Sequence, residues 1–148
     1  MTTLNPYLVF KDNCEEAFHF YKVVFGGEIL FMGRYKDVPQ GDKKLFPLST
    51  DEKIMHASLQ IAPNTVIMGC DSIEAYQGLT PKAANNFYLY ISAVSQAEAY
   101  RIFNELSAGG EATMPIGETF WSTHYGMLAD RFGIRWKITF DPDKEKNL

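Results

Sequence analysis

The sequence is poor in the residues and patterns that mark several large classes of protein. It has only two cysteines, Cys14 and Cys70, with no Cys-x-x-Cys pair and no Cys/His cluster, so a zinc site of the finger type is not expected. The 14 Lys and Arg residues are outnumbered by 18 Asp and Glu residues, and the net charge of -4 argues against nucleic-acid binding, which needs a basic face. No apolar run approaches the ~18 residues of a membrane span.

Signals for export and for common catalytic machinery are also missing. Residues 1–6 show no charged region followed by an apolar stretch, so no signal peptide is expected. No phosphate-binding loop is legible, and neither is a Ser/His/Asp or Cys/His nucleophile arrangement. The sequence therefore predicts a cytoplasmic protein without membrane or nucleic-acid partners. Its cysteines are predicted to be reduced, half-buried thiols, although the sequence leaves a disulfide open.

The chain does contain an internal repeat. Its 148 residues, 46% hydrophobic and 22% charged, suit one domain or two small halves that share a core. Phe20 is followed six residues later by Gly26-Gly27-Glu28, and Phe103 is followed six residues later by Gly109-Gly110-Glu111. Both features are offset by 83 residues. The repeat predicts two copies of one module.

Each module is predicted to hold one amphipathic helix, over residues 13–25 and 96–108. The apolar stripes are Cys14, Ala17, Phe18, Tyr21 and Phe25 in the first helix, and Ala99, Ile102, Phe103 and Leu106 in the second. A capping box is predicted at the start of each helix, formed by Asn13 with Glu16 and by Ser95 with Glu98. These two starts are 82 residues apart. Each helix ends in Gly-Gly, which readily takes the left-handed conformation of a helix end.

Strands are predicted on both sides of each helix, one before it and three after it. They are expected over residues 5–11, 28–36, 54–62 and 64–70 in the first half, and over 86–93, 111–118, 123–129 and 134–140 in the second. The polar, turn-rich stretch 33–53 is predicted to be a long loop. Residues 71–85 are expected to join the modules, and the charged tail from Asp141 is expected to fray.

The strand predicted near residues 54–62 shows clean alternation. One set of side chains comprises Met55, Ala57, Leu59 and Ile61, and the other comprises His56, Ser58 and Gln60. A half-buried strand gives this pattern. We expect the apolar set beneath a helix and the polar set facing water or a cleft.

Motifs along nearly the whole chain resemble those of one family. They are Asn5-Pro6-Tyr7-Leu8, Asn13-Cys14, Ala17, Phe20-Tyr21, Phe25-Gly26-Gly27, His56-Ala57, Glu118-Thr119-Phe120-Trp121, Tyr125-Gly126, Asp130-Arg131-Phe132-Gly133 and Trp136. Together they resemble the PhnB-like branch of the glyoxalase/bleomycin-resistance/extradiol-dioxygenase (vicinal oxygen chelate) superfamily. Such proteins are sometimes labelled 3-demethylubiquinone 3-methyltransferases. The sequence nevertheless has no Gly-rich strand-to-helix turn of the kind that methyltransferases use for their nucleotide cofactor.

The resemblance implies a fold and an assembly. The fold is α+β, in which two β-α-β-β-β modules form a curved mixed sheet around a cleft and the helices lie on the outer face. Residues 1–148 are expected to be a single domain, with one module over about 4–70 and the other over about 86–140. A homodimer is also implied, because many relatives pair modules across a two-fold axis.

The resemblance further implies where a metal would bind. Metal-dependent members hold a divalent ion with His, Glu or Gln side chains from the first and last strand of each module. Alignment by strands places Asn5 (or Pro6), Met68, Tyr88 and Lys137 at these positions. An amide oxygen is a weak ligand, a thioether suits copper(I), a neutral phenol is a poor ligand and an ammonium group repels a cation. We therefore predict that the metal site is lost and that there is no cofactor; a metalloenzyme with differently placed ligands is the alternative.

Two residues are candidates for acid/base chemistry. His56 belongs to a residue type that titrates near neutrality, and it lies on the polar face of its predicted strand. The alternative is a hydrogen-bonded structural histidine. Glu118 is a candidate general base or a partner of Lys137, and otherwise a surface residue at a strand end.

The remaining candidates are predicted to bind a ligand, and they are Tyr7, Met68, Tyr88, Tyr90, Trp121, His124 and Lys137. Strand alternation sends the three tyrosines toward the cleft, whereas it turns Phe87 and Trp136 toward the helices. A cation at Lys137 would receive a carboxylate or a phosphate-like group, unless a neighbouring carboxylate pairs with it. His124 would close over the cleft with Trp121, or face solvent in a turn.

These observations predict a small-molecule-binding protein that lacks the usual metal site and holds a small aromatic or anionic ligand in its cleft. Two alternatives stay open. One is a metal-independent enzyme with lyase- or isomerase-like acid/base chemistry at His56 or Glu118. The other is a divalent-metal enzyme of glyoxalase or dioxygenase type. The sequence does not decide between an enzyme and a binding protein.

Overall fold

The computed structural model describes residues 2–38, 50–73, 87–120 and 123–143. The chain divides into two compact units, Met1–Thr80 and Pro81–Leu148. The first contains β1 (Tyr7–Phe10), α1 (Cys14–Phe25), β2 (Glu28–Arg34), the short 3-10 helix η1 (Tyr35–Asp37), β3 (Ile54–Ala62) and β4 (Thr65–Asp71). The second contains β5 (Leu89–Ser92), α2 (Gln96–Ser107), β6 (Glu111–Glu118), β7 (His124–Ala129) and β8 (Arg135–Phe140). The repeated order of one strand, one helix and three strands is confirmed.

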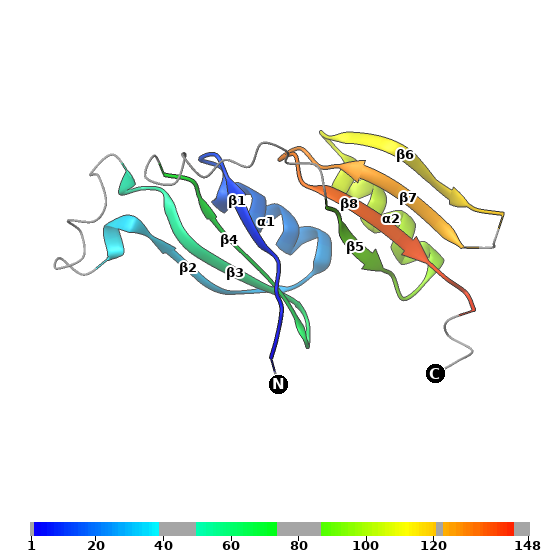
Figure 1. Ribbon diagram of the computed structural model, residues 1–148, viewed down its shortest axis with the longest axis horizontal. Coiled ribbons are helices and arrows are strands. Elements are labelled where there is room, and N and C mark those ends of the chain that lie inside the picture. Colours follow the sequence, from blue (N-terminus) through cyan, green and yellow to red (C-terminus); the bar gives the residue numbers. More distant parts are fainter. Residues whose placement is uncertain (1, 39–49, 74–86, 121–122, 144–148) are drawn as a thin grey trace. The chain divides into compact units, whose positions relative to one another are not determined.

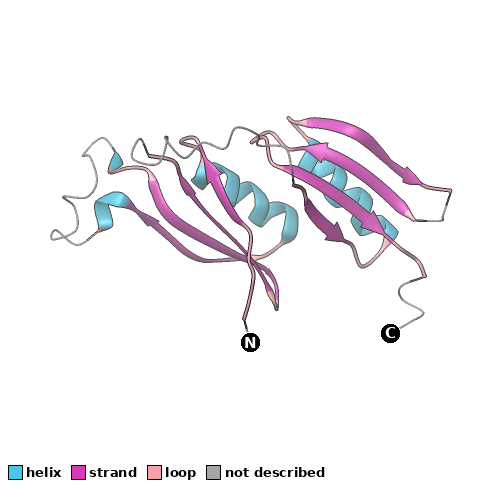
Figure 2. Ribbon diagram, viewed as in Figure 1, coloured by secondary structure: helices cyan, strands magenta, loops and turns pink. Residues whose placement is uncertain are grey.

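Each unit is built on its own mixed four-stranded sheet, which confirms the α+β class and the two modules. The strand order is β1-β4-β3-β2 in the first sheet and β5-β8-β7-β6 in the second. Within each sheet the first strand runs parallel to the last, and the other neighbours are antiparallel. The helix of each unit lies against one face of its sheet (Figures 1 and 2). We refer to the face opposite the helix as the open face of that sheet.

The core of the first unit lies between α1 and its sheet. Phe18 of α1 makes edge-on ring contacts with Phe10 of β1 and with Tyr21, at centroid distances of 6.2 and 6.3 Å. The buried helix residues are Cys14, Ala17, Phe18, Tyr21 and Val24, and the buried strand residues include Leu8, Phe10, Ala57, Leu59 and Ile67. Val24 is buried instead of Phe25, which the sequence predicts to be buried. The residue three positions after Tyr21 faces the sheet more directly than the residue four positions after it.

The second unit repeats this arrangement. The buried residues of α2 are Ala99, Ile102, Phe103 and Leu106, the stripe that the sequence predicts. They pack on Leu128 of β7 and on Trp136 and Ile138 of β8, which are also buried. The predicted orientation of Trp136 toward the helix is confirmed. Phe87 is different, because it lies before the start of β5 and its side chain is 56% exposed, so its predicted core position is wrong.

The paired glycines have the same two roles in both units. Gly26 and Gly109 adopt left-handed conformations, with φ of 66° and 76°. The following glycines lie against the neighbouring strand: a Cβ on Gly27 would be 2.2 Å from the Gln60 carbonyl oxygen, and one on Gly110 would be 2.2 Å from that of Ala129. The offset is 82 residues at both ends of the helices (14 to 96 and 25 to 107) and 83 at the glycines. The one-residue difference therefore arises at the C-terminal end, where Ala108 precedes the glycine.

The two helix starts are capped differently. The Ser95 hydroxyl accepts a hydrogen bond from the Glu98 backbone N–H at 3.1 Å, as predicted. Asn13 makes no side-chain cap, so the predicted capping box is wrong at α1. Asp71, at the end of β4, supplies the acceptor instead: its buried carboxylate binds the backbone N–H groups of Cys14 and Ile54 at 2.9 and 2.8 Å. A distant strand thus stabilises the first turn of α1.

Among the described parts of the chain, no helix has both the length and the apolar character needed to cross a membrane.

Candidate functional site

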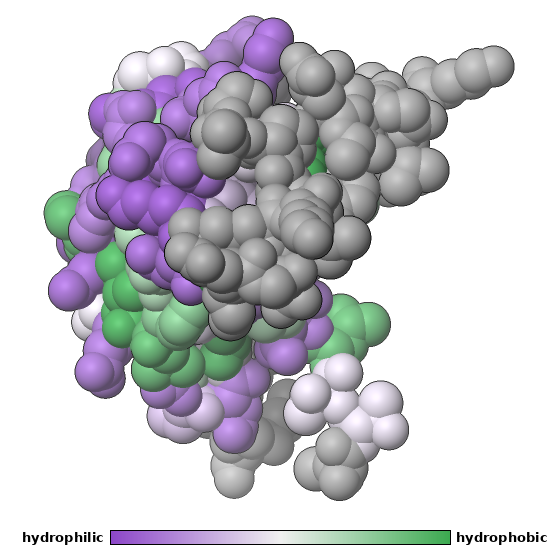
Figure 3. All heavy atoms as spheres, turned by 90° about the vertical axis from the view of Figure 1, so that its left-hand side faces the viewer, coloured by the Kyte–Doolittle hydropathy of each residue, from purple (hydrophilic) through white to green (hydrophobic). Residues whose placement is uncertain are grey.

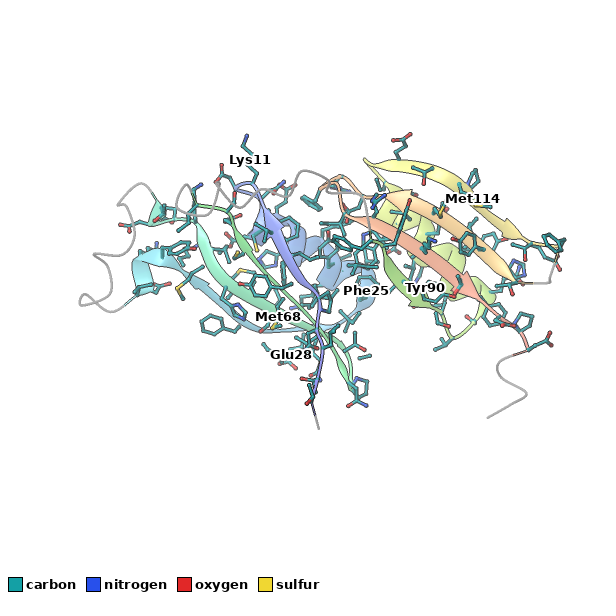
Figure 4. All side chains as sticks on the ribbon, viewed as in Figure 1. Lys11, Phe25, Glu28, Met68, Tyr90 and Met114 are labelled. Atoms are coloured by element: carbon teal, nitrogen blue, oxygen red, sulfur yellow. The ribbon has the colours of Figure 1, made fainter. Side chains whose placement is uncertain are left out.

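The open face of the first sheet brings together side chains from three neighbouring strands. Burial alternates along β1 and β4, so that Tyr7 and Met68 lie opposite the buried, helix-facing positions. The strand register pairs Tyr7 with Met68 and Met68 with Ser58 of β3. His56 lies two residues before Ser58 and therefore shares its face. Met68 is labelled on this sheet in Figure 4.

His56 is the centre of an aromatic cluster on this face. Its Nδ1 atom is 3.2 Å from the Tyr7 hydroxyl oxygen. The His56 ring lies 5.6 Å from the ring of Tyr7 and 6.0 Å from that of Phe31, measured between centroids. Because the hydrogen bond engages Nδ1, the Nε2 atom is left as the imidazole's other site for proton transfer. The Tyr7–His56–Phe31 cluster is partly exposed, with 46% of Tyr7 and 51% of Phe31 accessible.

A thiol lies near the Tyr7 hydroxyl. It belongs to Cys70, the next open-face residue of β4 after Met68. Partial burial raises the pKa of Tyr7 well above its usual value, and the nearby Cys70 raises it further. Burial likewise raises the pKa of Cys70, against the lowering effect of the Tyr7 hydroxyl. Both groups are therefore neutral at physiological pH, and both cysteines are free thiols.

The open face of the second sheet carries cations and aromatic rings. Arg135 and Lys137 alternate with the buried Trp136 and Ile138 along β8, so both project from the face opposite α2. The register pairs Lys137 with Tyr90 of β5 and with Met127 of β7. Tyr90 is labelled in Figure 4. Its hydroxyl oxygen is 3.0 Å from the Thr139 hydroxyl, which fixes the tyrosine on this face.

The ring of Tyr88 contacts both Arg135 and Lys137. The Arg135 guanidinium carbon lies 4.3 Å from the centroid of the Tyr88 ring, and the Lys137 ammonium nitrogen lies 4.9 Å from the same centroid. The ammonium group is also 5.9 Å from the Tyr125 ring. These distances are those of cation–π contacts. We refer to Arg135, Lys137, Tyr88 and Tyr125 as the cationic cluster.

The structure separates other predicted residues from these groups. His124, the first residue of β7, lies on the same face of the strand as the buried Gly126 and Leu128, which is the face toward the helix. Its Nδ1 atom lies 3.2 Å from the Tyr100 hydroxyl of α2. This differs from the predicted position over the ligand face, because alternation turns the side chain to the other side of the sheet. Glu118 is the cross-strand register partner of His124 and lies at the exposed end of β6. Trp121 lies outside the described residues.

The positions that the family resemblance assigns to a metal ion carry poor ligands for a hard divalent ion. Met68 offers a thioether, and Lys137 places an ammonium group beside Tyr88. Asn5, the first of these positions, precedes β1 and contributes only an amide oxygen. Across the described ranges, no group of three or more His, Cys, Asp and Glu side chains is arranged to hold a metal ion.

Sequence reasoning left three open-face residues out of the predicted site. Phe31 was hidden by a register irregularity in β2 between Ile29 and Phe31, which breaks simple alternation. Cys70 gave no signal beyond its place two residues after Met68. Arg135 had a usable signal, since it lies two residues before Lys137 on one strand and therefore shares its face.

Comparison with known proteins identifies a family and a fold. Residues 2–139 match the family described as 3-demethylubiquinone-9 3-methyltransferase. The crystal structure of protein PA1353 from Pseudomonas aeruginosa is 35% identical, with a TM-score of 0.81, over 95% of this chain and 98% of that one. A putative 3-demethylubiquinone-9 3-methyltransferase, PhnB protein, from Bacillus cereus is 25% identical, with a TM-score of 0.74, over 95% and 100%. A glyoxalase/bleomycin resistance/dioxygenase family enzyme from Burkholderia phytofirmans shares the fold, with a TM-score of 0.61 at 14% identity over 90% and 94%.

Proposed function

The chain belongs to the 3-demethylubiquinone-9 3-methyltransferase family and has the glyoxalase/bleomycin resistance/dioxygenase fold, and from this premise we propose that it binds a small aromatic or anionic molecule without a divalent metal ion. The observation that carries the proposal is the Tyr7–His56–Phe31 cluster, which presents partly exposed rings on the open face of the first sheet. Aromatic side chains with a few convergent polar groups are the usual lining of small-molecule sites.

The strand-to-helix connections support binding rather than methyl transfer. A nucleotide-type methyl donor is held by a Gly-rich turn between a strand and the following helix. Residues 11–13, between β1 and α1, read Lys-Asp-Asn, and residues 93–95, between β5 and α2, read Ala-Val-Ser. Neither connection contains glycine, so neither offers the close backbone approach that such a cofactor requires.

The apolar surface around β2 supports an organic ligand. Phe31 is about half exposed, at 51%. Figure 3 looks onto the end of the first unit that carries η1 and β2, and it shows hydrophobic side chains gathered beside hydrophilic ones. The Cβ of any residue replacing Gly33 would be 2.8 Å from the Phe31 ring, so this ring lies over Gly33, the cross-strand partner of His56.

Binding is tested by ligand-observed NMR with phenol, benzamide and benzoate as probes. The wild-type chain is expected to bind at least one of them saturably. Phe31→Ala is expected to weaken binding of the neutral probes about two- to tenfold, the range of an aromatic contact. Leu30→Ala is the matched control, since Leu30 is equally exposed on the same strand and has no ring contact with His56, and it is expected to bind normally.

Two results would contradict the proposal. One is the absence of saturable binding for every probe. The other is stoichiometric nickel, zinc or iron in protein purified without a chelator, measured by elemental analysis, because this would show that a metal binds despite the poor ligands at Met68 and Lys137.

A metal-independent enzyme is the second candidate function, and the Tyr7–His56 hydrogen bond favours it. A histidine whose Nδ1 is held by a partner keeps its ring orientation and presents Nε2 to a substrate. The neutral Tyr7 hydroxyl is suited to hold the imidazole rather than to remove a proton itself. Glu118 remains a candidate base at the exposed end of β6.

Acid/base chemistry at His56 is tested by solvent deuterium exchange into bound carbonyl compounds, followed by NMR. If the wild-type chain exchanges a carbon-bound proton, His56→Ala is expected to lower the rate about 100-fold, a typical contribution of a general base, with binding largely unchanged. Tyr7→Phe is the companion variant and is expected to lower the rate less, because the imidazole is retained. Equal rates in wild type and His56→Ala would exclude His56 from the chemistry.

A further inference from the structure

We propose that the cationic cluster of the second unit is an oxyanion site whose ligand is a small aromatic carboxylate. The inference deepens the proposed function, on which it rests, by naming a ligand class. It concerns Arg135 and Lys137, which project from the open face of β8 two residues apart. Both contact the ring of Tyr88, at 4.3 and 4.9 Å from its centroid.

The first observation concerns what pairs with these cations. Within residues 2–38, 50–73, 87–120 and 123–143, neither Arg135 nor Lys137 forms a salt bridge, whereas other basic residues do. Among the described residues, Arg34 pairs with Glu15, Lys36 with Glu52, Lys53 with Asp12, and Arg101 with Glu98 and Glu105. Arg135 and Lys137 are two cations close together on one strand, and neither has a carboxylate partner among the described residues.

In the described part of the chain, the strands beside β8 place no carboxylate next to the pair. The cross-strand neighbour of Arg135 is Ala129, and those of Lys137 are Met127 and Tyr90. All three are uncharged. Two like charges on one strand face repel each other, and none of these three neighbours carries a negative charge to offset that repulsion. A bound anion would relieve it.

The second observation is that the guanidinium group is held in place before any ligand arrives. An Nη2 N–H of Arg135 donates a hydrogen bond to the backbone carbonyl oxygen of Phe87 at 2.8 Å. The same group stacks on Tyr88, the next residue along the chain. Since guanidinium has five N–H donors, the group keeps donors for a ligand after this bond is made. A cation fixed in this way loses little conformational entropy when it binds an anion.

The shape and chemistry of the cluster favour a carboxylate attached to a ring. The planar guanidinium fork matches a carboxylate, and the ammonium group of Lys137 adds a point charge from the side of Tyr125. The rings of Tyr88 and Tyr125 contact these cations, and Tyr90 is the cross-strand neighbour of Lys137, so the open face offers aromatic area to a planar ligand. A free phosphate would use the charges and leave this aromatic area unused.

The test compares benzoate with its neutral isostere benzamide and with inorganic phosphate, in calorimetric titrations of the full chain. Benzoate is expected to bind at least about tenfold more tightly than benzamide, as a charge-assisted contact implies. Arg135→Gln and Lys137→Gln are each expected to weaken benzoate binding roughly 10- to 100-fold. Arg135→Lys keeps the charge but not the fork and is expected to be intermediate.

Lys36→Gln is the control, because it removes one positive charge from an exposed ion pair of the first unit, and benzoate affinity is expected to stay unchanged. Equal affinities for benzoate and benzamide would overturn the anion site and leave the proposed function standing. Phosphate that binds as tightly as benzoate would overturn the aromatic part of the assignment. If no probe binds at all, the proposed function fails together with this inference.

Discussion

Replacing Asp130 with alanine is expected to lower the free energy of unfolding by about 3–5 kcal/mol. The carboxylate is buried, with only 4% of the residue exposed, and both of its oxygens accept hydrogen bonds. One oxygen binds the backbone N–H groups of Phe132 and Ile134 at 2.9 and 3.0 Å, and the other binds the indole N–H of Trp136 at 2.9 Å. Alanine would leave the backbone donors of the β7–β8 turn and the fully buried indole without this acceptor. Urea unfolding followed by circular dichroism measures the loss.

Two further variants separate the contribution of the backbone hydrogen bonds from that of the indole hydrogen bond. Asp130→Asn keeps an oxygen for the two backbone donors but turns an amide N–H₂ toward the indole, so it is expected to cost about 2 kcal/mol. The double variant Asp130→Asn/Trp136→Phe is expected to lose less stability than the sum of the losses in the two single variants, because it no longer contains the indole donor. Strict additivity, or a loss under 1 kcal/mol for Asp130→Ala, would show that the carboxylate is not a structural acceptor.

Gly27→Ala is expected to destabilise the first unit by about 3 kcal/mol. A Cβ at this position would lie 2.2 Å from the carbonyl oxygen of Gln60, which belongs to the backbone of β3 and cannot rotate away. The chain enters β2 at the next residue, so relief of the contact would require β2 to move from its partner strand. The midpoint temperature of thermal unfolding is therefore expected to be lower in the variant than in the wild type.

Gly26→Ala is the matched control for this prediction. Gly26 has a φ of 66°, but a Cβ there meets no atom within 4 Å, so only the left-handed backbone is penalised. The expected cost is about 1 kcal/mol. The second unit repeats the experiment, since a Cβ on Gly110 would lie 2.2 Å from the Ala129 carbonyl oxygen. A larger loss at Gly26 than at Gly27 would contradict the steric explanation.

The regular elements could be predicted closely, because their signals are local. The predicted strand 54–62 coincides with β3 (Ile54–Ala62), and the predicted strand 111–118 coincides with β6 (Glu111–Glu118). Hydrophobic spacing reports which side of an element is buried, and glycine reports where the backbone needs a left-handed turn or a close approach. These quantities depend on a few consecutive residues.

The candidate site could be predicted only in part. Tyr7, His56 and Met68 lie on one open face as alternation predicts, and Lys137 projects from β8 as expected. The position of Phe31 beside His56 depends on the register irregularity of β2. The pairing of Arg135 with Tyr88 joins residues 47 positions apart, and no local pattern encodes such a contact.

The sequence by itself determined the two modules and their helices and strands. Hydrophobic periodicity and the Gly-Gly pairs are properties of the chain before it folds. Only the tertiary structure decided which groups meet: that Asp71 rather than Asn13 caps α1, that His124 faces α2, and that Arg135 and Lys137 share the ring of Tyr88. The physical reason is that these contacts join separate strands and helices, and their geometry is fixed by sheet register and packing rather than by neighbouring residues.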